Sequence, residues 1–169
     1  MTTISEGDLQ ITLPAGATAR KFDDQTTHGL SCCMKAVDFI VELDNLTYFI
    51  EFKDPDNPNA QLKDRTKFIK NFTSGELDND LKLKYRDSWL YEYAEGRADK
   101  PIYYLVLLGA STLSDTDLLA RTDQLKSKLP MNGPAGREWQ RPFVKGCAVM
   151  NLASWNKRFT HMPASRISS

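Results

Sequence analysis

Residues 35–53 carry the pattern that most restricts how this chain can fold. Apolar side chains recur at every second position over residues 37–43 and again over 48–52, a period that is typical of half-buried β-strands. Between the two runs lie Asp44 and Asn45, residue types that favour turns. The segment therefore predicts a β-hairpin with a two-residue turn.

The remaining sequence predicts further strands and helices around this hairpin. Residues 102–108 lack polar alternation, which indicates a strand that is buried on both faces and central in its sheet. A capping-box pattern of Ser114 and Asp117 opens a helix that ends at Pro130. The other expected elements are strands at 9–13, 17–22 and 143–152, a helix with Leu62, Phe68, Ile69 and Phe72 on its apolar side, a helix over 77–94, and a short helix with Trp155 and Phe159. This order predicts an α/β fold with a mixed central sheet and flanking helices, in a single domain spanning residues 1–169.

Composition limits how the protein can recognise a partner and where it works. Lys and Arg together number 22, as do Asp and Glu, and the pI is near 6.7, which excludes binding to nucleic acid or membranes by bulk charge. No apolar run approaches the ~20 residues of a membrane span, and no secretory signal is visible. The three cysteines include the adjacent pair Cys32 and Cys33, so no disulfide framework is expected. We expect a cytoplasmic protein without a membrane segment.

The hairpin register brings chemically active residues together. With a two-residue turn, paired positions sum to 89, which sets Asp38 opposite Glu51 and leaves Lys53 on the same face. Two facing carboxylates need a cation, a shared proton or solvent. Mg²⁺ or Mn²⁺ suits carboxylate oxygens, and the backbone carbonyl of Phe52 is a further candidate ligand. Lys53 could orient or deprotonate an attacking water, or stabilise negative charge on phosphorus. The alternative is an exposed, solvated sheet face.

This arrangement resembles the PD-(D/E)XK phosphodiesterases, the restriction-endonuclease-like nucleases. The resemblance rests on Val37-Asp38, twelve intervening residues, and Glu51-Phe52-Lys53 on a hairpin that a helix follows, with Val37 in place of the common proline. It implies a restriction-endonuclease-like core, metal binding by Asp38 and Glu51, and assistance from Lys53 in the attack on the phosphodiester.

The resemblance also directs attention to the chain on either side of the hairpin. Family members often carry a Gln or a basic residue in the following helix, which matches Gln61, Lys63, Arg65 or Lys67. Many also place an acidic residue on a first helix, for which Glu6 or Asp8 is available, although no helical pattern precedes the strands. The tripeptide acid-x-Lys occurs twice, about as often as chance predicts, so the hairpin context carries the resemblance.

The helix after the hairpin has a basic side. Lys63, Lys67 and Lys70 share one arc and Arg65 lies beside them. Such a stripe favours contact with phosphates, and its alternative is the solvated side of an amphipathic helix. The sequence therefore predicts nucleic-acid contacts at Gln61, Lys63, Arg65, Lys67 and Lys70.

Two functions remain open at this level. The first is a Mg²⁺- or Mn²⁺-dependent nuclease that acts on DNA or RNA. The second is a catalytically inactive module of the same architecture that binds nucleic acid or a protein partner, including a second copy of the chain. A small-molecule enzyme is not supported, because the sequence has no Gly-rich phosphate loop and no nucleophile elbow.

Overall fold

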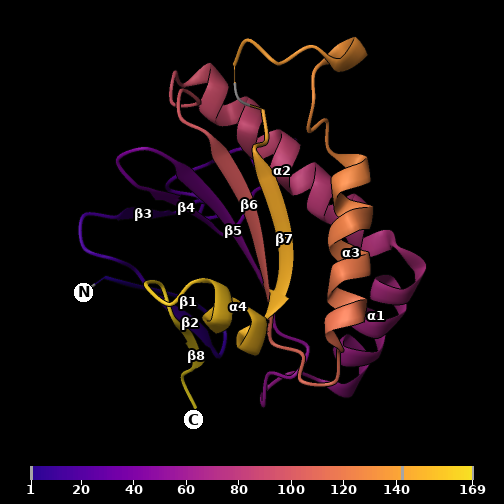
Figure 1. Cartoon of the computed structure of the whole chain (residues 1–169). Helices are drawn as coiled ribbons and strands as arrows, with labels where there is room; N and C mark the ends of the chain where they lie inside the picture. Colours follow the sequence, from indigo (N-terminus) through magenta and orange to yellow (C-terminus); the bar gives the residue numbers. More distant parts are fainter. Residues whose placement is uncertain (1, 142, 169) are drawn as a thin grey trace.

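A mixed five-stranded sheet forms the centre of the computed structural model, which describes residues 2–141 and 143–168 (Figure 1). Its strands, in spatial order, are β3 (Thr18–Lys21), β4 (Phe39–Glu42), β5 (Thr47–Lys53), β6 (Ile102–Leu108) and β7 (Gly146–Asn151). The first three strands are antiparallel, whereas β6 and β7 run parallel to β5. The expected α/β class and mixed sheet are confirmed.

The hairpin of β4 and β5 has the predicted register. Val41 pairs with Tyr48, and Ile40 pairs with Phe49, so paired positions sum to 89. Leu43 donates its backbone N–H to the carbonyl of Leu46 at 2.9 Å, which closes a two-residue turn. The interior strand β6 is buried on both faces, as its unbroken apolar run predicted.

Three long helices cover one face of this sheet (Figure 1). They are α1 (Leu62–Ser74), α2 (Glu76–Ala94) and α3 (Asp115–Lys128). Aromatic rings fill the space between α2 and the sheet: Tyr85 lies 5.4 Å from Phe49 and 5.1 Å from Tyr104, between ring centroids. All three rings are fully buried. Their large apolar area fixes how α2 lies across the strands.

The apolar side expected for α1 is only partly used. Phe72 is buried and packs with Phe68 against the core, but Leu62 is 79% exposed and Ile69 is 57% exposed. The prediction that Leu62 and Ile69 face the core is therefore wrong. α1 packs mainly against α2, and only Phe68 and Phe72 of its apolar side reach the core.

The helix α3 begins at the predicted capping box. The hydroxyl of Ser114 accepts the N–H of Asp117 at 3.2 Å, and the Asp117 carboxylate accepts the N–H of Ser114 at 3.0 Å. We expect Ser114→Ala to lower the free energy of unfolding by about 1 kcal/mol, because the N–H of Asp117 loses the hydroxyl that accepts its hydrogen bond. Urea denaturation measures this loss. Ser127→Ala, in the last turn of the same helix, is the control and should change stability by less than about 0.5 kcal/mol.

A second, three-stranded sheet and a short helix cover the other face (Figure 1). The sheet contains β1 (Thr3–Glu6), β2 (Leu9–Thr12) and β8 (Ala164–Arg166), and the helix is α4 (Leu152–Arg158). Trp155 of α4 is fully buried and donates its indole N–H to the carbonyl of Met162 at 2.8 Å. Neither β1 nor β8 was expected from the sequence.

Arg166 ties this second sheet to the end of the central one. Its guanidinium contacts the carboxylates of Asp8 and Asp54 at 2.9 Å each and the carbonyl of Gly109 at 2.8 Å. A Cβ atom at position 109 would lie 2.1 Å from the Asp54 carboxylate, so any larger residue would push Asp54 away from Arg166. The clamp fixes the C-terminal ends of β5 and β6.

No helix in the described ranges is long and apolar enough to cross a lipid bilayer. A short 3-10 turn, Pro134–Gly136, lies between α3 and β7.

Candidate active site

Asp38 and Glu51 lie together beneath the helices, on the face of the sheet that the hairpin register predicts. Asp38 directly precedes β4, and its carboxylate accepts the backbone N–H of Phe52 at 2.7 Å. Glu51 lies within β5 and is fully buried, whereas Asp38 is 5% exposed. The alternative of an exposed, solvated sheet face is therefore wrong: the α1–α3 layer covers these carboxylates.

A lysine that the sequence analysis did not single out lies between the two acids. Lys84 extends from α2, and its ammonium lies 2.5 Å from Glu51 Oε1 and 3.4 Å from Asp38 Oδ1. The facing carboxylates thus already have a cation from the chain itself. A signal for Lys84 does exist in the sequence: it continues the buried series of Leu77 and Leu81 at a helical spacing, where a charged residue needs a buried partner.

Lys53 joins this cluster from the strand. Its ammonium lies 2.9 Å from the same oxygen of Glu51 and 4.0 Å from a carboxylate oxygen of Asp80 on α2. Asp80 also pairs with Lys35. Charges of opposite sign therefore alternate from the sheet to the surface. Asp80 begins the second acid-x-Lys tripeptide of the sequence. This tripeptide lies on a helix and not on a hairpin, but the packing of α2 on the sheet brings Asp80 to the cluster.

Burial and charge change the proton affinities in the cluster. Burial, together with the neighbouring Glu51 carboxylate, raises the pKa of Asp38 to about 7, although Lys84 opposes the shift. Burial alone would lower the pKa of Lys84, but the charges of Glu51 and Asp38 outweigh it and raise that pKa above its usual value. Lys84 therefore stays charged at neutral pH, while Asp38 is close to its titration point.

One oxygen of the cluster has no partner. Lys84 and Lys53 both contact Oε1 of Glu51, whereas Oε2 is buried without a hydrogen bond. The hydroxyl of Tyr104 on β6 is buried and unpaired as well. Unpaired buried oxygens are costly, so the carboxylate pair has capacity for a further donor or a metal ion.

The carboxylates present fit a divalent ion only if water or substrate supplies its remaining ligands. Among residues 2–141 and 143–168, no group of three or more His, Cys, Asp or Glu side chains is placed to hold a metal. Asp38 and Glu51 offer two carboxylates. The Phe52 N–H points at Asp38, and its carbonyl faces the same side of β5 because both groups of one strand residue share a side. Mg²⁺ commonly binds through one or two carboxylates and retains several waters.

A pocket of about 540 Å³ opens beside the cluster, between α1 and α2. Lys53 and Asp80 line it, and so does Lys67 from α1. The other expected nucleic-acid contacts, one just before α1 and three within it, lie outside the pocket, on the surface. These are Gln61, Lys63, Arg65 and Lys70, all of them exposed. Arg65 also pairs with Asp56, so Lys67 is the α1 cation that reaches the pocket.

The acids near the N-terminus do not reach the cluster. Glu6 pairs with Lys21, and Asp8 contacts Arg166 and Ser168. Both lie in or beside a β-hairpin, not on a helix. Neither residue supplies the extra acid that a first helix often carries in PD-(D/E)XK enzymes.

Comparison with known proteins yields no relative: no family model, no curated protein and no solved structure matches the chain. What the molecule does must therefore be inferred from its own residues.

The raised pKa of Asp38 leads to a test of its burial. The folded chain holds the Asp38 proton up to about pH 7, whereas an unfolded chain releases it near pH 3.9. This contribution to stability is complete below pH 4 and is lost as the pH rises through 7. Asp38→Asn removes it, so the variant should gain roughly 2 kcal/mol relative to the wild type between pH 5 and pH 8. Urea denaturation at both pH values measures the gain. Asp44→Asn, in the exposed turn, is the control; equal behaviour of the two variants would contradict the assignment.

Proposed function

We propose that this protein is a divalent-metal-dependent phosphodiesterase that cleaves DNA or RNA, with a restriction-endonuclease-like core. The observation that carries the proposal is the convergence of Asp38, Glu51 and Lys53 on one buried face, with a carboxylate oxygen of Glu51 left without a partner. The order of an antiparallel hairpin, two helices and a parallel strand beside the second hairpin strand supports the same reading.

Each residue has a definite role in this proposal. Asp38 and Glu51 would hold Mg²⁺ or Mn²⁺, with the Phe52 carbonyl as a further candidate ligand. A bound divalent ion would supply positive charge that stabilises the phosphoryl oxygens as negative charge develops on them. Lys53 reaches the pocket and Glu51 at once, so it is placed to orient the attacking water or stabilise that charge. Lys67 contacts the phosphate backbone from the other wall of the pocket.

Lys84 sets a condition on metal binding. Its ammonium contacts both carboxylates, so an ion that binds between them must displace it. Lys84 carries one charge and a divalent ion two, and facing carboxylates favour the ion of higher charge when its ligand geometry is satisfied. Lys84 would then have Asp80, one turn before it on α2, within reach beside the Lys35 and Lys53 that already contact that carboxylate.

The same lysine favours a second candidate function. If Lys84 remains between the carboxylates, it neutralises them permanently and the fold is a catalytically inactive module. Such a module binds nucleic acid, a protein partner or a second copy of the chain through its surface. In either case we infer a cytoplasmic protein, since Cys32 and Cys33 are exposed as free thiols.

A cleavage assay separates the two functions. Supercoiled plasmid, single-stranded DNA and RNA are incubated with the protein in Mg²⁺, Mn²⁺ or a chelator. The proposal expects cleavage of at least one substrate with a metal, none with the chelator, and none with Glu51→Gln. Binding without cleavage in every metal would overturn the phosphodiesterase and favour the inactive module.

A further inference from the structure

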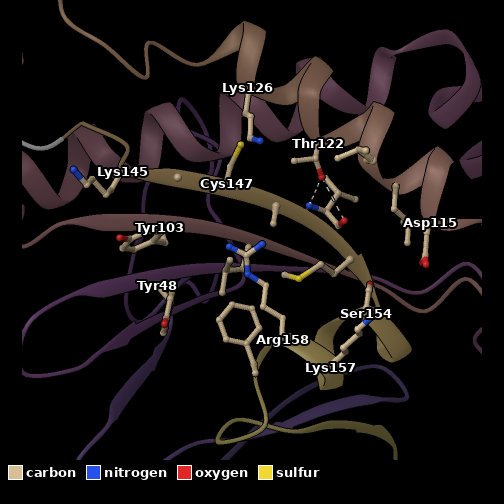
Figure 2. A pocket seen from close by; sticks show the side chains of 18 of the residues that line it. Tyr48, Tyr103, Asp115, Thr122, Lys126, Lys145, Cys147, Ser154, Lys157 and Arg158 are labelled. Carbon is tan, nitrogen blue, oxygen red and sulfur yellow. Dashed lines mark hydrogen bonds between the residues drawn. The ribbon is translucent and has the colours of Figure 1, made fainter. Parts of the chain in front are cut away.

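A second and larger hollow, of about 980 Å³, follows the outer strand β7 (Figure 2). α3 forms one wall and α4 the other. Figure 2 shows Lys126 and Cys147 on the α3 side of β7, with Tyr48, Tyr103 and Arg158 on the opposite side. None of Asp38, Glu51 and Lys53 lines this groove. The groove is therefore a site separate from the carboxylate cluster, and what it binds does not depend on the proposed phosphodiesterase.

The groove has an excess of positive charge in a protein whose net charge is zero. Four basic side chains and one acidic side chain line it: Lys126, Lys145, Lys157, Arg158 and Asp115. In the described part of the chain, the four basic residues form one ion pair, an exposed contact of 3.5 Å between Lys126 and Asp123. Exposed pairs of this kind contribute little. The groove therefore complements an anionic occupant.

Flat apolar groups accompany these charges. Tyr103 is half-buried, and its ring lies 6.1 Å from that of Tyr48. Tyr48 in turn lies 6.0 Å from Phe159, and the guanidinium of Arg158 lies 5.9 Å above the Phe159 ring. Basic side chains beside the partly exposed ring of Tyr103 complement a nucleic-acid strand, in which phosphates alternate with planar bases.

The backbone of β7 argues against a peptide as the occupant. An added β-strand would need the free N–H and C=O groups of this outer strand. The hydroxyl of Thr122 accepts the N–H of Val149 at 2.9 Å and donates to its carbonyl at 3.4 Å. The N–H of Asn151 donates to Ser154 at 3.0 Å. Backbone groups at the centre and the end of β7 thus already have hydrogen-bond partners within the chain, so an occupant of the groove must be bound by side chains.

We propose that the groove between α3 and α4 binds single-stranded nucleic acid without cleaving it. Lys126, Lys145, Lys157 and Arg158 contact successive phosphates, and Tyr103 stacks on a base. Four phosphate contacts on a single strand correspond to a salt slope, log K against log salt concentration, of about −3.

Fluorescence anisotropy with a labelled 12-nucleotide oligo-dT tests this site, in chelator so that no metal-dependent cleavage occurs. Reversing two charges with Lys145→Glu and Lys157→Glu should weaken binding at least tenfold and flatten the salt slope by about 1.4. The matched control reverses two basic residues of α2 that line neither pocket, Lys82→Glu and Arg86→Glu, and should leave binding within about twofold. Circular dichroism verifies that both double variants are folded.

A second pair of variants tests stacking. Tyr103→Ala should weaken oligo-dT binding about tenfold, whereas Tyr103→Phe should retain it, because a base stacks on either ring. A ten-residue oligoglutamate should compete poorly for the groove. The proposal is overturned if the α2 control variant loses as much binding as the groove variant, if oligoglutamate binds as tightly as oligo-dT, or if the wild type binds no oligonucleotide at low salt.

Discussion

Lys84→Met should tighten divalent-metal binding at least tenfold while it destabilises the metal-free protein. Methionine keeps most of the apolar stem but removes the ammonium that contacts Glu51 and Asp38. Without a metal, two buried carboxylates then face each other with only Lys53 beside Glu51. Loss of one partner from a buried ion pair costs about 3–5 kcal/mol. The cost should be smaller at pH 5 than at pH 8, because Asp38, whose pKa is already raised, takes up a proton.

Two measurements separate the halves of this prediction. Urea denaturation in chelator gives the loss of stability, and isothermal titration calorimetry with Mg²⁺ or Mn²⁺ gives the affinity. Lys82→Met is the matched control, since Lys82 lies on the same helix, two residues away, outside the carboxylate cluster, and should change neither quantity by much. Equal metal affinity in the wild type and Lys84→Met would show that this ammonium does not compete with the ion.

Lys53→Ala should reduce cleavage by about 10²–10³-fold without weakening metal binding. Removal of one group that stabilises charge in a transition state has an effect of this size. Glu51 keeps Lys84 as a partner, so the folded protein should remain stable. Rates under saturating Mn²⁺ and the metal affinity from calorimetry are compared for the variant and the wild type.

Lys35→Ala provides the control for Lys53. Lys35 lines the same pocket and pairs with the same Asp80, but forms no ion pair with Glu51. We expect its cleavage rate to stay within about tenfold of the wild type. Cleavage that survives Lys53→Ala, or that falls equally in both variants, would remove Lys53 from its catalytic role.

The sequence was sufficient for the part of the site that depends on local geometry. A strand period of two and a two-residue turn determine which side chains face each other. The sequence alone therefore predicted that Asp38 and Glu51 lie opposite each other, without knowledge of the packing. The helix at Ser114 and the buried strand β6 were equally local signals. Each was read from residues within one or two elements.

Packing between distant elements supplied what the sequence could not. The position of Lys84 depends on how α2 crosses the sheet, and an amphipathic pattern predicts a buried face without saying what it meets. The same limit explains Leu62 and Ile69, which continue an apolar period but remain exposed. β8 pairs with β2 from the other end of the sequence, a relation that no local period encodes.

Calorimetric titration of Mn²⁺ and Mg²⁺ into the wild type and Glu51→Gln at pH 8 tests the central claim most directly. If the carboxylate pair is a metal site, the wild type binds one ion with saturable heat, its melting temperature rises with metal concentration, and Glu51→Gln loses both effects. If neither the wild type nor Lys84→Met binds either ion at millimolar concentration, the pair is a buried ionic cluster and the proposed phosphodiesterase is wrong.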